Sequence, residues 1–273
     1  MTDMRDTDRA NAEFWDELCG SAFAQSIGIG DDRSLAALVK FDRAYLDYYP
    51  YLLDRVPVGT MRGKTVLEIG LGYGTLGQQI AAAGARYVGL DIAQGPVRMM
   101  THRLRMQGLS GDAVRGSMLE CPCRTESLDV VVSIGCFHHT GDVGRCIDET
   151  YRVLKPGGLA YIMVYNLFSL RQWRAAPGAS LRELLRSPVS AGRRADERQR
   201  AMYDANLAGS AAPETVFLSR RRLAFLMRRF SHVDIRSEND DPLVVRGRTL
   251  AGRETMLLLA RLWGLDLYVE ARK

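Results

Sequence analysis

The chain has 273 residues, of which 47% are hydrophobic and 25% are charged, enough for one α/β domain with a sizeable core and an appended cap. Its net charge of +5 comes from 37 basic and 32 acidic residues. Such a mild excess suits solubility and does not by itself indicate nucleic-acid binding.

The sequence also lacks the patterns of a secreted or membrane protein. Its five cysteines are an odd number without the spacing of a disulfide framework. The first ten residues contain no apolar core of the kind that directs secretion. The most apolar late run, 255–265, is interrupted by Arg261 and is shorter than the roughly 20 residues of a membrane span. We therefore expect a reduced, cytoplasmic protein without a transmembrane segment.

The N-terminal part is predicted to form a helical cap. Residues 1–13 are polar, and we expect them to be frayed. Ordered structure should begin at Phe14, and residues 35–53 carry apolar and aromatic side chains at helical spacing. Two helices are therefore expected before the first strand.

The stretch 65–75 predicts a buried strand, a tight turn and the start of a helix. Gly70, Gly72 and Gly74 follow the spacing G-x-G-x-G, which differs from the G-x-G-x-x-G of a dinucleotide loop. Glu68 stands just before the turn, where its carboxylate would repel a phosphate and attract a cation. This pattern favours adenosine carrying a positive group.

A second acidic residue, Asp91, ends the next apolar run, 87–90. At this place a carboxylate can accept hydrogen bonds from both ribose hydroxyls. S-adenosylmethionine, an adenosine sulfonium, satisfies both Glu68 and Asp91.

From residue 65 onward the pattern alternates between strands and helices, which predicts a doubly wound parallel sheet. The expected strands are 65–69, 87–90, 112–115, 128–133, 158–164, 233–237 and 265–271. The expected helices are 76–83, 94–107, 143–153 and 220–230. Residues 155–158 are interpreted as a turn before the fifth strand. The segment 166–219 lacks strand patterns and is rich in arginine, so we expect a cap beside the crevice, with 187–196 as a mobile linker.

Several motifs in order carry a family resemblance. They are the glycine loop 68–74, Asp91, the strand 128–134 followed by His138-His139-Thr140, and Arg152-Val-Leu-Lys-Pro-Gly-Gly158. With them the chain resembles the class I S-adenosylmethionine-dependent methyltransferases, in particular a bacterial group that acts on small molecules. The resemblance covers about residues 60–168. It implies a Rossmann-like, seven-stranded, mostly parallel sheet with helices on both faces and an antiparallel last strand. The chain would consist of an N-terminal helical cap (1–58) and a methyltransferase domain (59–273). A second helical cap (166–219) would be inserted in this domain after the fifth strand.

The resemblance implies a set of residues around the cofactor, S-adenosyl-L-methionine, whose product would be S-adenosyl-L-homocysteine. They are Glu68, Gly70, Gly72, Gly74, Thr75, Leu76, Asp91, Ile92, Ser117, Met118, Ile134, Gly135 and Cys136. At the position of Ser117 the resembled group usually has an acidic residue, whose carboxylate hydrogen-bonds the edge of the adenine ring. The Ser117 hydroxyl and the Met118 N–H could still hydrogen-bond the ring.

On the acceptor side, His138 and His139 are candidate general bases, because a histidine pKa lies near the working pH. The alternative is that they hold the loop or touch the cofactor carboxylate. The candidate substrate-binding residues are Tyr45, Tyr49, Tyr165, Asn166, Arg171, Trp173 and Arg174. For the tyrosines the alternative is packing against the core, and for the arginines it is a solvated basic face.

The cysteines are interpreted as structural. Cys136 could be a nucleophile, but a buried thiol without an activating base is inert. Cys121 and Cys123 resemble half of a metal clip whose second pair is missing, so no metal is expected.

The sequence therefore predicts an S-adenosylmethionine-dependent methyltransferase (class EC 2.1.1) that acts on an oxygen or nitrogen of a small-molecule acceptor, with natural-product biosynthesis as one setting. The alternatives are an RNA or protein methyltransferase and a protein that binds the cofactor without methylating. We expect a monomer or homodimer with no nucleic-acid or membrane partner.

Overall fold

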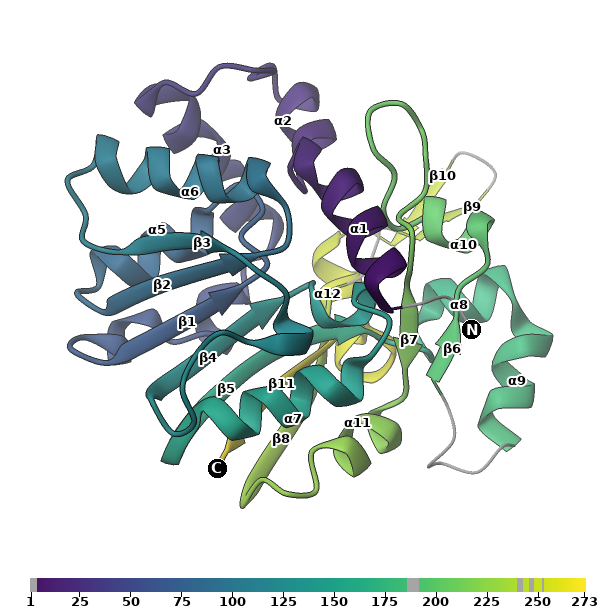
Figure 1. The fold of residues 1–273 in the computed structure, drawn as a ribbon. Coiled ribbons are helices and arrows are strands. Elements are labelled where there is room, and N and C mark those ends of the chain that lie inside the picture. The colour runs from purple at the N-terminus through teal and green to yellow at the C-terminus, as the bar shows by residue number, and fades with distance from the viewer. Residues whose placement is uncertain (1–3, 186–191, 240–242, 246–247, 252) are drawn as a thin grey trace.

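The computed structural model describes residues 4–185, 192–239, 243–245, 248–251 and 253–273. Its central sheet contains β1 (Thr65–Ile69), β2 (Arg86–Asp91), β3 (Asp112–Arg115), β4 (Leu128–Ile134), β5 (Leu154–Tyr165), β8 (His232–Glu238) and β11 (Asp266–Arg272). The seven strands lie in the order β3-β2-β1-β4-β5-β11-β8 (Figure 1). Strands β1 to β5 pair in parallel, and β11 runs antiparallel to both β5 and β8. The predicted fold class is confirmed, including the antiparallel last strand.

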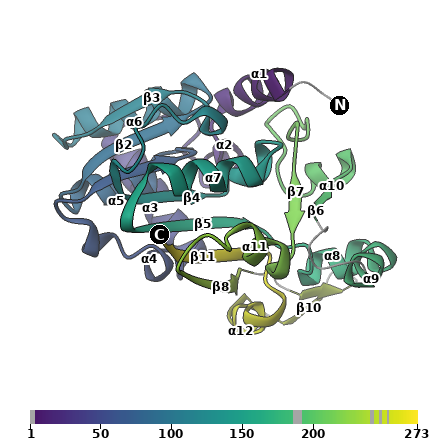
Figure 2. The same ribbon diagram turned by 60° about the horizontal axis from the view of Figure 1, so that its bottom comes forward.

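Helices cover both faces of this sheet (Figures 1 and 2). Because side chains alternate along a strand, Val66 and Val130 face one side while Leu67 and Val131 face the other. The first face packs against α4 (Leu52–Arg55), α5 (Thr75–Ala82) and α6 (Gln94–Met106), and the second against α7 (Val143–Val153) and α11 (Arg220–Leu226). Among the described residues, none of the helices is both long enough and apolar enough to cross a bilayer.

The N-terminal segment is more ordered than the sequence predicted. It forms α1 (Met4–Phe14), the short 3₁₀ helix η1 (Trp15–Glu17), α2 (Ser21–Ser26) and α3 (Leu35–Tyr48). The expectation of a frayed 1–13 is wrong from Met4 onward, and residues 1–3 lie outside the described part. Tertiary contacts order α1, since the buried Asn11 donates from Nδ2 to the His139 carbonyl oxygen at 2.7 Å. Beyond α1, Asp16 Oδ1 accepts from the Gly95 N–H at 2.6 Å and so joins η1 to the start of α6.

The segment after β5 contains helices and two strands. The helices are α8 (Leu170–Ala175), α9 (Pro177–Leu185) and α10 (Glu197–Ala201), and the strands β6 (Gly192–Arg194) and β7 (Val216–Leu218) pair antiparallel. The prediction of a segment without strands is wrong, because strands of three residues are too short to show an alternating pattern. The expected linker 187–196 lies partly outside the described residues, and its end forms β6. Strands β9 (Leu243–Val245) and β10 (Arg248–Ala251) pair ahead of α12 (Arg253–Trp263), which packs on β8.

Residues 155–158 form a bulge in β5, where the sequence predicted a separate turn before the strand. The pairing with β4 shifts between Leu128, opposite Leu154, and Val130, opposite Leu159. A left-handed residue in the bulge, Gly157, has a φ of +78°. Strand β5 therefore has extra residues at this point that β4 does not match, and it continues on both sides of the bulge.

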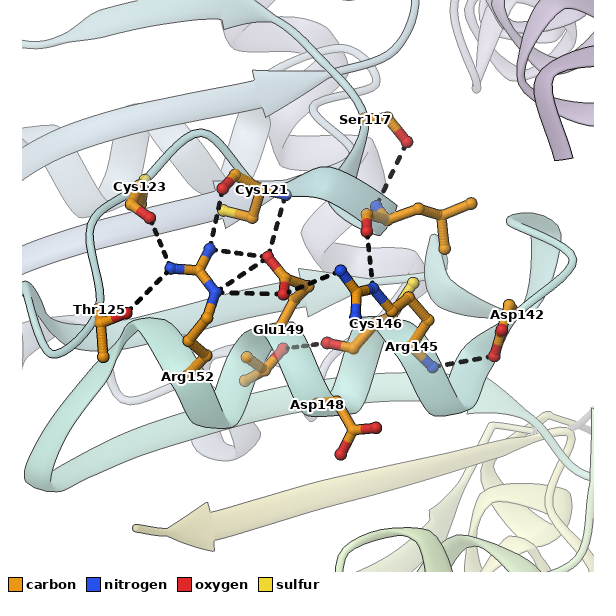
Figure 3. A network of polar contacts seen from close by, with 12 residues as sticks. Ser117, Cys121, Cys123, Thr125, Asp142, Arg145, Cys146, Asp148, Glu149 and Arg152 are labelled. Atoms are coloured by element: carbon orange, nitrogen blue, oxygen red, sulfur yellow. Dashed lines mark hydrogen bonds and ion pairs between the residues drawn. The ribbon is translucent and has the colours of Figure 1, made fainter.

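Arg152 from the Arg-Val-Leu-Lys-Pro-Gly-Gly motif holds the chain that follows β3 (Figure 3). Its guanidinium donates to the carbonyl oxygens of Cys121 and Cys123, each at 2.9 Å, and to Glu149 Oε2 at 2.7 Å. The Cys121 N–H donates to the same Glu149 oxygen at 3.2 Å. The motif thus clamps α7 to the loop that carries Ser117.

Candidate active site

A cavity of about 510 Å³ lies at the carboxyl ends of the parallel strands. Its floor is formed by the loops after β1, β2, β3 and β4 and by the end of β5, and its cover by residues 14–23 and 203–206. Every residue predicted for the cofactor lines this one cavity: Glu68, Gly70, Gly72, Gly74, Thr75, Leu76, Asp91, Ile92, Ser117, Met118, Ile134, Gly135 and Cys136. Open parallel sheets bind their ligands at this edge.

The glycine loop passes close to the end of β4 and to α6. Gly70 has a φ of +79°, and a Cβ atom there would lie 2.6 Å from the Cβ of Cys136. Gly74 also has a φ of +79°, and its Cβ would lie 2.9 Å from side-chain atoms of Met100 and Arg103. Only glycine combines this backbone conformation with this close approach. The two glycines therefore fix the path of the loop along the cavity.

Behind the loop, a buried polar network joins three helices. The fully buried Arg103 donates from Nη1 to Asp42 Oδ2 at 2.8 Å and to Gln78 Oε1 at 2.7 Å. The Thr75 hydroxyl donates to the other Asp42 oxygen at 2.6 Å. Since Asp42 belongs to α3, the N-terminal helices are attached directly to the first turn of α5.

Two buried carboxyl groups stand at the ends of β1 and β2. Burial raises the pKa of Glu68 to about 8, against the hydrogen bond that Tyr87 donates to Oε2 at 2.5 Å. Asp91 accepts from the Leu71 N–H at 2.8 Å and from the Ala93 N–H at 2.9 Å, one on each oxygen. Burial raises the pKa of Asp91 to about 6. Each Asp91 oxygen keeps a lone pair that a ribose hydroxyl can use.

An acidic side chain does lie at the end of β3, but it comes from α1. Asp8 lines the cavity together with Ser117 and Met118, and its carboxyl group interacts with the Ser117 side chain. Burial raises the pKa of Asp8, and the interaction with Ser117 opposes that rise. Sequence reasoning missed this residue because α1 was expected to be frayed.

His139 faces the cavity and an aspartate that the sequence reasoning also missed. Its Nδ1 lies 2.7 Å from the Glu214 carbonyl oxygen, and because a carbonyl only accepts, Nδ1 carries the proton. Nε2 lies 3.5 Å from Asp204 Oδ2, to which the Tyr165 hydroxyl donates at 2.9 Å. Burial raises the pKa of Asp204, opposed by His139 and Tyr165. The other ring nitrogen, Nε2, therefore faces the Asp204 carboxyl group.

His138 has a different environment from its neighbour. It is fully buried, lies outside the cavity lining, and neither ring nitrogen has a hydrogen-bond partner among the described residues. Its ring packs 4.0 Å from that of Tyr165 and 4.2 Å from that of His139. Burial lowers its pKa well below the usual value. His138 therefore does not face the cavity, and its role stays a prediction.

The predicted substrate-binding residues divide into two groups. Tyr45, Tyr49 and Tyr165 line the cavity, and the rings of the first two lie 4.8 Å apart. Arg171, Trp173 and Arg174, by contrast, lie outside its lining.

Two of the predicted residues outside the lining, Asn166 and Arg171, have other contacts. Asn166 donates from Nδ2 to the Gly264 carbonyl oxygen at 2.7 Å and accepts from the Phe168 N–H at 3.0 Å. The Arg171 guanidinium lies 4.5 Å from the centre of the Tyr203 ring. Arg171 therefore contacts a residue of the cavity wall from outside.

The cysteines are free thiols. Burial raises the pKa of Cys136 well above its usual value, which disfavours a thiolate nucleophile. Within the described ranges, no three His, Cys, Asp or Glu side chains gather as a metal site.

A parallel sheet of this strand order, with a glycine loop after β1 and an acidic residue ending β2, is the fold of class I methyltransferases. Residues 67–162 match the model of a protein family described as a methyltransferase domain. The resemblance predicted from the motifs is confirmed.

Solved structures show the same fold. S-adenosylmethionine-dependent methyltransferases from Methanosarcina mazei and Mesorhizobium loti superpose with a TM-score of 0.52 each, at 18% and 17% identity. The first match covers 78% of this chain and 93% of the other, and the second 82% and 97%.

Two curated relatives match over part of their length. The phthiotriol/phenolphthiotriol dimycocerosates methyltransferase of Mycobacterium tuberculosis is 32% identical over 59% of this chain and 59% of its own. The ubiquinone biosynthesis O-methyltransferase of Bartonella bacilliformis is 29% identical over 45% of this chain and 48% of its own. The chain thus aligns with about half of each relative's length.

Proposed function

We propose that this chain transfers a methyl group from S-adenosylmethionine to an oxygen or nitrogen of a small-molecule acceptor. The observation that carries the proposal is that one cavity unites the glycine loop, Glu68 and Asp91 with an aromatic space at the ends of β4 and β5. The names of both curated relatives, which are small-molecule methyltransferases, support the same acceptor class.

Each residue of the cavity floor has a definite part in this proposal. Asp91 would accept from the ribose hydroxyls, and Glu68 would attract the ammonium group of the methionine half. Gly70 and Gly74 let the backbone approach the ligand. S-adenosylmethionine supplies an electrophilic methyl group, so the protein mainly has to align the acceptor with it.

The cover of the cavity completes the arrangement. Glu17 Oε1 accepts from the Leu207 N–H at 2.8 Å, which joins η1 to the loop after α10. Figure 1 shows α1 lying beside this loop, across the carboxyl edge of the sheet. Such a cover shields the reacting groups from water. A cavity of this size also favours a small acceptor over a macromolecule.

Calorimetric titration with S-adenosylmethionine and S-adenosylhomocysteine tests the cofactor half of the proposal. Asp91→Ala should weaken binding of both by about 1–3 kcal/mol, because a charged hydrogen-bonding partner is lost. Asp148→Ala is the matched control, since Asp148 is exposed and pairs with Arg229 away from the cavity. Unchanged affinity in folded Asp91→Ala would refute the assignment. Labelled methyl groups appearing in a product in step with S-adenosylhomocysteine would exclude a protein that only binds the cofactor.

A further inference from the structure

The cavity extends beyond the space assigned to the cofactor. Most of the predicted cofactor residues follow β1, β2 and β3. Ile134, Gly135 and Cys136 at the end of β4 border the other half, which continues to the end of β5. We call this other half the acceptor chamber and define it by His139, Tyr165, Tyr203 and Asp204 together with Trp15 above them. Strand order therefore separates the two halves along one edge of the sheet.

The acceptor chamber is aromatic. The Trp15 ring lies 4.9 Å from that of His139, and the Tyr165 ring lies 4.8 Å from that of Tyr203. The chamber continues into a wider aromatic wall of the same cavity: Phe14, Tyr45, Tyr49 and Tyr268. Such surfaces accept planar rings, and their faces attract cations.

Lysine and arginine are absent from the described residues that line the cavity, although the whole chain carries a net charge of +5. Asp204 brings a carboxyl group to the chamber, and Glu17 lines the same cavity. His139, inside the lining, and Arg171, outside it, oppose the rise in the pKa of Asp204 that burial causes. An acceptor bearing a carboxylate or phosphate would meet carboxyl groups without a lysine or arginine to bind it.

We propose that the acceptor is a protonated aromatic amine, whose ammonium group binds Asp204 and whose proton His139 accepts before methyl transfer. This inference rests on the proposed methyltransferase function and deepens it. An ammonium group satisfies the Asp204 carboxylate, and the flanking rings add cation–π attraction. The aryl part of the amine fits the aromatic wall.

The proton transfer follows from the tautomer of His139. With Nδ1–H donated to the Glu214 carbonyl oxygen, a neutral His139 has its lone pair on Nε2, which lies 3.5 Å from Asp204 Oδ2 and can take a proton from an ammonium group held there. The amine lone pair then bonds to the methyl carbon as the bond from that carbon to sulfur breaks, and the electron pair stays on sulfur. The products are a methylated ammonium ion and S-adenosylhomocysteine, and His139 finally releases its proton to water.

The first test is calorimetry on the full chain saturated with S-adenosylhomocysteine. The probes are two matched pairs, tryptamine with indole-3-propionate and 2-phenylethylamine with 3-phenylpropanoate. Each amine should bind at least about tenfold more tightly than its carboxylate partner, because only the amine pairs with Asp204. Equal binding of amine and carboxylate, preference for the carboxylate, or binding of neither overturns the inference.

Variants then assign the preference to Asp204. Asp204→Asn, which keeps the size of the side chain and an acceptor for Tyr165, should weaken amine binding by roughly ten- to hundredfold. Asp204→Glu should restore part of it, and Asp148→Asn should change nothing. Unchanged affinity for S-adenosylhomocysteine shows that each variant is folded. Retention of full amine affinity in Asp204→Asn contradicts the inference.

The proton step has its own readout. With labelled S-adenosylmethionine, the amines that bind should become methylated, and His139→Gln should lower the rate by about a hundredfold or more while amine binding persists. Absence of methyl transfer to every bound amine, or an unchanged rate in His139→Gln, contradicts the step. A protein that fails to bind S-adenosylhomocysteine at all would instead refute the proposed function, and the inference with it.

Discussion

The two halves of the cavity are built in different ways. The half assigned to the cofactor takes Glu68, the glycine loop, Asp91 and Ser117 from consecutive strand-to-loop junctions of the sheet. The acceptor chamber joins the ends of β4 and β5 to η1 and to the loop after α10, segments that are far apart in the sequence. One half therefore depends on local backbone geometry and the other on long-range contacts.

The two halves of the cavity can therefore accept sequence changes to different extents. The sheet and its first loops can keep one cofactor site, because their geometry follows from β1, β2 and β3. The cover lies outside the sheet, and its two parts meet through contacts such as the hydrogen bond from the Leu207 N–H to Glu17. Loops on a rigid scaffold commonly carry specificity in this way.

The largest expected effect comes from the local half, at Gly70. Gly70→Ala should lower the free energy of unfolding by roughly 2–5 kcal/mol and abolish measurable binding of S-adenosylhomocysteine, because the new methyl group meets Cys136 in a left-handed backbone conformation. Denaturant unfolding and calorimetry measure the two effects. Gly63→Ala is the matched control, since Gly63 has a φ of +74° but nothing within 4 Å of its added Cβ. Equal losses in both variants would show that the close approach to Cys136 is unimportant.

A second expected effect is that the protein releases a proton from Glu68 when it binds the cofactor. With its pKa raised to about 8, Glu68 is protonated in the empty protein at pH 7 and must ionise to bind an ammonium group. Calorimetry at pH 7 in buffers of different ionisation enthalpy should therefore detect release of roughly 0.9 proton from this group. In Glu68→Gln this release should disappear and affinity should fall. Proton release that persists in Glu68→Gln would assign it to another group.

The same pKa predicts how stability depends on pH. Since the folded pKa of Glu68 lies above its ordinary value of 4.5, the unfolded chain loses this proton first as the pH rises. The contribution of Glu68 to stability should then decrease from about pH 4.5 to about pH 8. Thermal unfolding of the empty protein should show a smaller decrease for Glu68→Gln than for the unmodified chain.

The smallest effect tests whether the two halves are truly separate. Asp8 belongs to the N-terminal cover but reaches Ser117 in the cofactor half. Asp8→Asn should weaken binding of S-adenosylhomocysteine by about 1 kcal/mol if its carboxylate helps to hold the adenine. Asp6→Asn on the same helix is the control, because Asp6 is exposed and pairs only locally with Arg9. Equal effects of the two variants would point to α1 as a whole and not to the Asp8 carboxylate.

The sheet was predictable because its determinants are local. Strands β1 and β3 and helix α7 begin and end at the predicted residues, and the other strands of the main sheet differ mostly at their ends. Apolar runs bounded by glycine and acidic residues are sufficient to place such strands. All predicted cofactor residues consequently lie on one edge, as parallel strands require, although their binding roles stay predictions.

Other features were missed because nothing nearby in the sequence marks them. Helix α1 is polar, and it is ordered by contacts such as that of Asn11 with His139. The segment 166–219 is rich in arginine, yet Asp204 is its only charged side chain among the described residues that line the cavity. The two adjacent histidines were equivalent in sequence, and only the fold buries His138 and exposes His139 to the cavity.

The sequence by itself determined the order of the strands along the chain, the glycine loop and the two carboxyl groups that follow β1 and β2. These features depend on side-chain periodicity and on backbone conformations that few residues can adopt. The tertiary structure alone decided that Asp8 would meet Ser117 and that Asp204 would meet His139. Such pairs bring together residues whose separation along the chain carries no pattern, so their chemistry appears only when the chain has folded.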